Sequence, residues 1–226
     1  MKTAILVRHG ESELSATGRT NGDPSVAGAL TDTGWEQARR LGKLLAREPL
    51  DLCVVSEFQR TRETADLALE GRDVPRLVVP DLNDIRFGEF EGLQLADYRL
   101  WARAHGPEEA APGGGDSRAD TVRRYVRGYR TILARPERTI LVVVHGLPVR
   151  YALDAVAGHD PAPAVEQVPY AEPFRLDADD LTRAVERLEG WTEHPAWAAE
   201  DRPRLWQTAL SVIDSFHAAL RRMRDR

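Results

Sequence analysis

The chain has 226 residues, of which 42% are hydrophobic and 30% charged, with a formal net charge of -5 and a single cysteine. This composition supplies enough apolar material for a core and excludes wholesale disorder. The acidic balance has the wrong sign for a protein whose main work is to hold nucleic acid, so nucleic acid is not an expected partner. The first apolar run ends at Arg8, too short for a signal core, and no run approaches membrane-spanning length. We therefore expect a cytoplasmic protein, with no membrane partner, built around one main domain.

Four short apolar runs rich in β-branched residues predict strands. They lie at residues 3–7, 52–55, 77–79 and 139–144. Because the runs are continuous rather than alternating, they suit strands that are covered on both faces. Apolar residues recur at helical spacing between them, at 35–45 and 122–133. The sum predicts an α/β fold, a three-layer α/β/α sandwich around a mostly parallel sheet, with Cys53 as a buried thiol.

Two helix starts carry the pattern of a capping box. Ser56 with Gln59, and Ser117 with Asp120, have the spacing at which each member of the pair satisfies a free backbone N–H group. We therefore expect helices to begin at both places. Trp35, which lies on a predicted helix, is expected to pack in the core.

The rest of the chain has weaker patterns. Residues 106–116, rich in glycine and proline, predict a mobile connector that borders a site. Residues 165–176 predict an extended hairpin at the sheet edge. Residues 179–226 are expected to be helical, with an apolar stripe from 206 to 220. That stripe predicts a face packed on the main domain or on a partner, including a homodimer through this helix; the alternative is a lid.

Two predicted strands are each followed by a histidine and a glycine. The first strand leads into Arg8, His9 and a glycine, and the 139–144 strand leads into His145 and a glycine. Ligands of open α/β sheets bind beyond the carboxyl ends of the strands, so both histidines are expected at one edge. Arg60, early in the helix after the 52–55 strand, points to that edge. Arg62 lies two residues further on, faces another side of the helix and is expected on the surface.

Two arginines and two histidines at one sheet edge form a local anion site. Planar guanidinium groups suit a phosphoryl group, so the expected ligand is phosphate or a small phosphorylated substrate. A neutral histidine held by a hydrogen bond on its other nitrogen can attack phosphorus. Cationic side chains can then stabilise the transferred group without a metal. The six histidines of the chain show none of the zinc-ligand spacings, so no metal and no cofactor is expected.

Four sequence motifs make the chain similar to a known family. They are Arg8-His9-Gly10-Glu11-Ser12, Leu30-Thr31-Asp32-Thr33-Gly34-Trp35-Glu36-Gln37-Ala38, Ser56-Glu57-Phe58-Gln59-Arg60-Thr61 and Val144-His145-Gly146. Over residues 3–157 the chain resembles the histidine phosphatase superfamily, whose fold is also called phosphoglycerate mutase-like. The resemblance implies a histidine phosphatase domain over residues 1–178, followed by the helical extension 179–226.

The resemblance also implies a role for each residue of the anion site. His9 would be the nucleophile that becomes phosphohistidine. Arg8 and Arg60 would clamp the phosphate, and His145 would donate a second hydrogen bond to the phosphoryl oxygens. These roles agree with the chemistry expected from the residues themselves.

The general acid departs from the family pattern. The family's acid lies in an L-x-E-x-x-x-G-x-x-E-G stretch, and Asp84 takes its position here. Aspartate is one methylene shorter than glutamate and has a slightly lower reference pKa, about 3.9 against about 4.3. To protonate a leaving alkoxide, Asp84 must be desolvated or lie close to the charge of the phosphate. Glu89 and Glu91 are competing candidates for this role.

The loop after the nucleophile departs from the family as well. Where many members have an asparagine that binds phosphate, this chain has Ser15, which can still donate one hydrogen bond. The surrounding pattern is similar to the branch that includes sugar-bisphosphate phosphatases. That similarity implies a small phosphorylated metabolite as substrate and Asn21 as a substrate contact. On the residues alone, 15–22 is a turn-rich loop.

Three functions remain open from the sequence. The leading one is a metal-independent phosphomonoesterase in which His9 attacks and Asp84 protonates the leaving alcohol. The second is a phosphoglycerate mutase-type isomerase, which needs a closed pocket that shields phosphohistidine from water. The third is a catalytically degenerate module that keeps the anion site for recognition.

Overall fold

The computed structural model describes residues 1–197. One mixed sheet of five strands runs in the order β3-β2-β4-β1-β5. Its strands are β1 (Thr3–Arg8), β2 (Leu52–Val55), β3 (Arg76–Val78), β4 (Thr139–Val144) and β5 (Pro173–Asp177). β1, β2, β3 and β4 are parallel to their neighbours in this group, and β5 pairs antiparallel with β1. All four predicted runs therefore form strands, shifted by one residue in β3.

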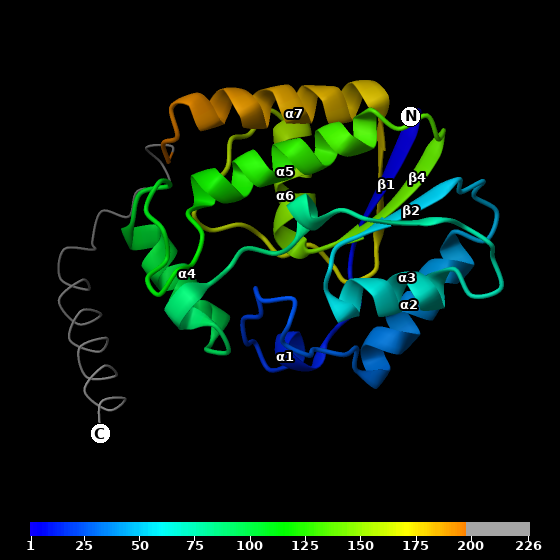
Figure 1. The fold of residues 1–226 in the computed structure, drawn as a ribbon, viewed down its shortest axis with the longest axis horizontal. Helices are drawn as coiled ribbons and strands as arrows, with labels where there is room; N and C mark the ends of the chain where they lie inside the picture. The colour runs from blue at the N-terminus through cyan, green and yellow to red at the C-terminus, as the bar shows by residue number, and fades with distance from the viewer. Residues whose placement is uncertain (198–226) are drawn as a thin grey trace.

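Helices cover both faces of the sheet, as Figure 1 shows. α5 (Arg118–Leu133), α6 (Gly146–Val156) and α7 (Ala178–Glu193) lie on one face. α2 (Asp32–Leu44) and α3 (Gln59–Ala68) lie on the other. The described elements are completed by α1 (Glu13–Ala16), α4 (Leu95–Ala104) and the short 3₁₀ helices Pro80–Leu82 and Gly88–Phe90. The predicted three-layer α/β/α architecture is confirmed.

Successive residues of β1 pack alternately against the two helical layers. Ala4 and Leu6 belong to the core under α5, α6 and α7. Ile5 and Val7 belong to the core over α2 and α3. This is why the run is continuously apolar, since side chains alternate between two buried faces. Cys53 is fully buried in the second core, and burial raises the pKa of its thiol to about 12.

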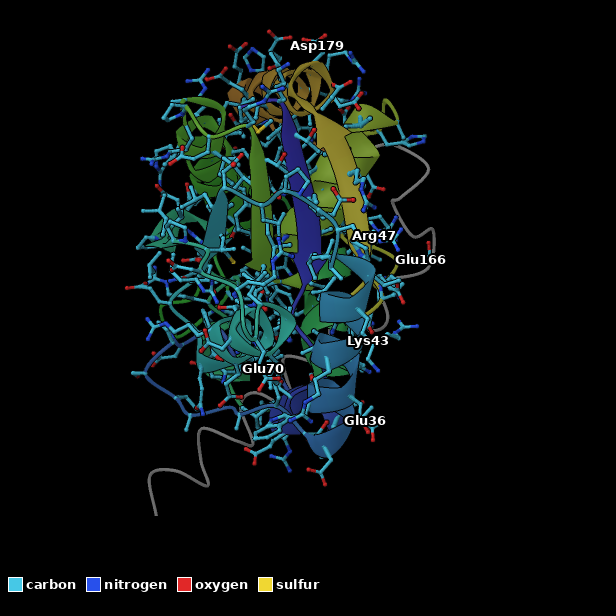
Figure 2. All side chains as sticks on the ribbon, turned by 90° about the vertical axis from the view of Figure 1, so that its right-hand side faces the viewer. Glu36, Lys43, Arg47, Glu70, Glu166 and Asp179 are labelled. Atoms are coloured by element: carbon cyan, nitrogen blue, oxygen red, sulfur yellow. The ribbon has the colours of Figure 1, made fainter. Side chains whose placement is uncertain are left out.

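The outer helix faces are polar. Figure 2 shows Glu36 and Lys43 projecting from α2 into the surroundings, and both are exposed. Trp35, predicted to be in the core, is instead 43% exposed on the same helix. Its ring lies 5.5 Å from the guanidinium carbon of Arg39, so a cation–π contact replaces core packing there.

The capping predictions had different outcomes. Ser117 is the N-cap of α5 and accepts a hydrogen bond from the backbone N–H of Asp120, as predicted. Ser56 does not cap α3, which begins at Gln59 after Phe58 and has no side-chain cap. The Ser56 hydroxyl serves the site described below.

Two loop predictions were wrong in part: residues 106–116 form an irregular connector but do not border the pocket, and residues 165–176 contribute an edge strand but no hairpin. The predicted connector 106–116 is held by backbone hydrogen bonds from Glu89 N to Pro112 O (2.7 Å) and from Asp116 N to Arg86 O (2.9 Å), and none of its residues lines the pocket described below. The predicted hairpin at 165–176 is a single edge strand, β5, preceded by a loop over 157–172 that has only one isolated bridge to β1. Prolines in this loop prevent a second paired strand.

α7 belongs to the sandwich, because its apolar side chains complete the core beneath α5 and α6. The predicted stripe at 206–220, and with it the homodimer and lid interpretations, lies outside the described residues. Within residues 1–197, no helix is long and apolar enough to cross a membrane.

Candidate active site

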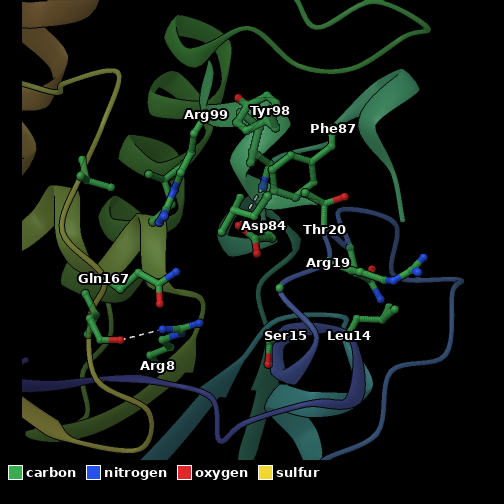
Figure 3. A pocket seen from close by; sticks show the side chains of 18 of the residues that line it. Arg8, Leu14, Ser15, Arg19, Thr20, Asp84, Phe87, Tyr98, Arg99 and Gln167 are labelled. Atoms are coloured by element: carbon green, nitrogen blue, oxygen red, sulfur yellow. Dashed lines mark hydrogen bonds between the residues drawn. The ribbon is translucent and has the colours of Figure 1, made fainter. Parts of the chain in front are cut away.

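A pocket opens at the carboxyl ends of β1 and β4. Arg8, His9, Arg60 and Asp84 line it together with Ser15 and Asn21. Its other walls come from α4, from the N-terminus of α5 and from the 157–172 loop (Figure 3). The structure thus brings the predicted residues to one edge of the sheet.

His9 is buried directly after β1 and is oriented by its two ring nitrogens. Nδ1 lies 2.6 Å from the carbonyl oxygen of Gly10, and Nε2 accepts from Arg60 Nε at 3.1 Å. A guanidinium N–H can only donate, so the ring is neutral, with its proton on Nδ1 and its lone pair on Nε2. Burial, with Arg60 and Arg8, holds the pKa of His9 well below its usual value. The site therefore holds His9 in a fixed orientation, with an unprotonated Nε2.

Arg60 donates hydrogen bonds to several other residues of the site. It is only 4% exposed, and its Nη2 lies 3.0 Å from Asn21 O, 3.3 Å from Asp84 Oδ2 and 3.1 Å from His145 Nδ1. Burial lowers its pKa to about 10, so the guanidinium still carries a full charge at neutral pH. A charge buried this deeply attracts an anion bound beside it more strongly than an exposed charge would.

His145 is fully buried and does not itself line the pocket. Its Nδ1 accepts from Arg60, so the ring proton is on Nε2, which donates to Ser56 Oγ at 2.8 Å. Ser56 Oγ in turn lies 3.0 Å from Thr61 Oγ1. Burial and Arg60 lower the pKa of His145. His145 Nδ1 must therefore gain a proton before it can donate a hydrogen bond to a phosphoryl oxygen. A bound dianion favours that protonation.

Asp84 is the carboxylate next to these groups. Its Oδ2 lies 3.6 Å from His145 Nδ1, and its Oδ1 accepts from the backbone N–H of Ile85 at 3.1 Å. Burial raises the pKa of Asp84, although Arg60 opposes the shift. The environment thus moves the carboxyl toward the protonated form that a general acid needs.

The two competing glutamates are placed elsewhere. Glu91 accepts from the backbone N–H groups of Gly22 and Phe87, both at 2.8 Å, and so joins two loops. Neither Glu89 nor Glu91 lines the pocket. By position, Asp84 is the better candidate for the acid.

Arg8 is positioned by residues that the sequence did not indicate. Its Nη1 donates to Val168 O at 2.8 Å, and its guanidinium carbon lies 3.7 Å from the centre of the Tyr170 ring. Its Nε is buried without a partner among the described residues and remains free to bind a ligand oxygen. Val168 and Tyr170 carry no motif, so only the folded chain reveals their role.

Ser15 and Asn21 reach the pocket with different side-chain partners. The Ser15 hydroxyl accepts from Ser12 N at 2.8 Å and closes the capping box of α1. Asn21 Oδ1 is buried with no partner in the described chain, so it can accept a hydrogen bond from a substrate hydroxyl. Within residues 1–197, no cluster of three or more His, Cys, Asp or Glu side chains is placed to hold a metal ion.

Comparison with known proteins places this constellation in a family. The family model of the histidine phosphatase superfamily (branch 1) matches residues 4–190. The chain belongs to the histidine phosphatase superfamily.

Relatives of this family member include named phosphatases and mutases. The chain is 35% identical over 62% of its length, and 72% of the other, to an adenosylcobalamin/alpha-ribazole phosphatase of Salmonella typhimurium. It is 36% identical over 65% of its length, and 77% of the other, to a 2,3-bisphosphoglycerate-dependent phosphoglycerate mutase of Azorhizobium caulinodans. A putative alpha-ribazole-5'-P phosphatase of Escherichia coli aligns with a TM-score of 0.67 at 27% identity, covering 78% of this chain and 90% of that one. These likenesses support its assignment as a phosphoric monoester hydrolase of the histidine phosphatase type.

Proposed function

We propose that the protein is a metal-independent phosphomonoesterase that hydrolyses a small phosphorylated metabolite through a phosphohistidine at His9. The observation that carries this proposal is the protonation pattern of His9, in which Gly10 O fixes the proton on Nδ1 and Arg60 faces the Nε2 lone pair. A neutral, oriented imidazole beside a buried guanidinium is what nucleophilic attack on a phosphate ester requires.

The reaction balances in two steps. In the first, the His9 Nε2 lone pair forms a bond to phosphorus, the bond from phosphorus to the ester oxygen breaks, and protonated Asp84 gives its proton to that oxygen. In the second, water attacks the phosphohistidine, the Asp84 carboxylate takes a proton from it, and the bond from phosphorus to nitrogen breaks. Inorganic phosphate leaves, and both side chains return to their starting states.

The arginines stabilise the transferred group. Arg60 contacts His9 and Arg8 lines the same pocket, where charge on the equatorial oxygens needs compensation. His145 adds a proton donor once the dianion is bound. Ser15 and Asn21 face the substrate side of the same pocket.

The test is phosphate release from an alkyl phosphate in the presence of a chelator, with wild type compared with His9→Ala. The proposal predicts turnover by wild type and none by the variant. A protein that does not hydrolyse any ester but exchanges phosphoryl groups between phosphoglycerates is a mutase. A protein that neither hydrolyses esters nor exchanges phosphoryl groups is a catalytically degenerate module that binds phosphate.

A further inference from the structure

The pocket carries more positive charge than one phosphoryl group needs. Within the described chain, five arginines line it: Arg8, Arg19, Arg60, Arg99 and Arg118. Its lining holds two carboxylates, and one of them, Glu166, is 85% exposed and pairs with Arg150 at 3.5 Å. Asp84 is thus the one that faces the arginines from inside the pocket. A dianionic phosphoryl group together with Asp84 leaves positive charge uncompensated.

Arg99 is the clearest of the uncompensated charges. It lies on α4 and is half-buried, and within residues 1–197 it makes no hydrogen bond and no ion pair. Figure 3 shows its side chain pointing into the pocket, as does the side chain of Gln167 from the 157–172 loop. Burial, with the nearby charges of Arg118, Arg103 and Arg8, lowers the pKa of Arg99.

Arg118 strengthens the same side of the pocket. Its Nε donates to Tyr98 Oη at 3.0 Å, its Nη1 to Tyr151 Oη at 2.7 Å and its Nη2 to Pro163 O at 3.5 Å, so all three acceptors are neutral. It is only 6% exposed and has no ion pair in the described chain. Its positive charge therefore adds to that of Arg99 on this side of the pocket.

We propose that Arg99, supported by Arg118, binds a second anionic group on the alcohol part of the substrate. This inference rests on the proposed phosphomonoesterase function and narrows its substrate class to phosphate esters that carry a further carboxylate or phosphoryl group. The second group lies on the α4 side of the pocket, while the transferred phosphoryl group lies at His9.

The test uses matched pairs of ligands that differ in the second charge. Phosphoglycerate is compared with glycerol phosphate, and a hexose bisphosphate with the hexose monophosphate. Binding is measured by calorimetry on His9→Ala, which leaves the esters intact, and kcat/KM is measured on the wild-type background. The two arms distinguish a carboxylate from a phosphoryl group as the second anion.

Arg99→Gln is expected to reduce the preference for the more highly charged member of at least one pair by roughly tenfold or more, the factor for one lost charge-assisted hydrogen bond. Arg99→Lys is expected to keep most of that preference, since the charge remains. Arg103→Gln, an exposed arginine on the same helix, is the control and is expected to change neither ratio.

An absence of preference in both pairs, or an equal loss for both members in Arg99→Gln, overturns the inference. If wild type binds the pairs with the expected preference but does not hydrolyse any of them, the proposed function fails and this second anion site stands. The binding ratio on His9→Ala therefore decides the inference separately from turnover.

Discussion

At the scale of single residues, two buried histidines share one guanidinium but have opposite proton patterns. His9 keeps its proton on Nδ1 and His145 keeps its proton on Nε2, because Arg60 donates to the remaining nitrogen of each ring. The lowered pKa of both rings means that His9 stays neutral below the usual histidine range. We therefore expect the acidic limb of the pH profile of kcat/KM to lie below about pH 6.5.

Asp84→Asn is expected to lower kcat for an alkyl phosphate by roughly 10²–10⁴-fold, because the leaving alkoxide then has no proton donor. The loss should be much smaller for nitrophenyl phosphate, whose leaving group needs no proton. Since burial raises the pKa of Asp84 and the acid form is the active one, wild-type turnover of the alkyl ester should fall as pH rises through that pKa. Steady-state rates across pH measure both effects. Equal losses on the two esters would argue against Asp84 as the acid.

Ser56→Ala is expected to reduce the free energy of unfolding by about 1–3 kcal/mol, because the buried Nε2–H of His145 loses its acceptor. The activity should fall with it, since the orientation of His145 is lost. Ser25→Ala, at an exposed turn, is the matched control. Urea unfolding measures the difference, and a change no larger than that of the control contradicts the role of Ser56.

The residues with strand-end positions could be predicted from the sequence, and those that orient them could not. Arg8, His9 and His145 follow continuous apolar runs, so their convergence at one edge follows from the parallel sheet. Ser56 has the spacing of a helix cap, and local spacing cannot show that a histidine far along the chain takes its hydroxyl. Tyr170 comes from a proline-rich loop whose path depends on the whole fold.

At the scale of elements, Asp84 is held by a helix on the other side of its loop. Arg124 of α5 donates to Asn83 O at 2.6 Å and to Asp84 O at 3.0 Å. Arg124→Met should therefore loosen the loop and lower kcat for an alkyl phosphate by about 10²-fold, the cost of a small misplacement of a reacting group. Arg127→Met, one turn on, is the control, because Arg127 is exposed and, among the described residues, its guanidinium pairs with the Asp81 carboxylate and not with Asn83 or Asp84. A purely KM effect in Arg124→Met contradicts this positioning role.

Two helical glycines should respond in opposite ways to alanine. At Gly34 of α2, a Cβ would lie 2.0 Å from Glu11 O, so the helix must move away from the loop that follows His9. We expect Gly34→Ala to lower the free energy of unfolding by about 1–3 kcal/mol and to reduce kcat. At Gly190 of α7, a Cβ meets nothing within 4 Å, so Gly190→Ala should raise the free energy of unfolding by about 0.5–1 kcal/mol. Thermal and urea unfolding measure both, and a tolerant Gly34 contradicts the close packing.

Elements with strong periodicity could be predicted, and those defined by distant partners could not. Both faces of β1 and β4 are buried, so the sequence of each strand is a continuous apolar run. β5 is an edge strand whose pairing with β1 depends on the return of the chain after α6. α4 was not predicted, although its apolar residues recur at helical spacing and form a separate cluster with the loops that carry Asp84.

At the scale of the whole molecule, the third layer depends on α7. This helix buries Leu181, Val185, Leu188 and Trp191 against α5 and α6. Burial of one large apolar side chain contributes about 1.5–3 kcal/mol, so the four together are comparable with the whole stability of a domain, about 5–15 kcal/mol. A chain that ends at residue 178 should therefore be unfolded. Circular dichroism measures this, and a folded, active product contradicts the place of α7 in the core.

The central claim is that the phosphoryl group passes through His9, and rapid-quench trapping tests it most directly. Wild type is mixed with a labelled phosphate ester in chelator, quenched in alkali within one turnover, and digested for mass spectrometry. We predict an acid-labile, alkali-stable phosphoryl group on the peptide that carries His9, formed before phosphate appears and absent in His9→Ala. Phosphate release without any such intermediate, or with turnover retained in His9→Ala, would contradict the account.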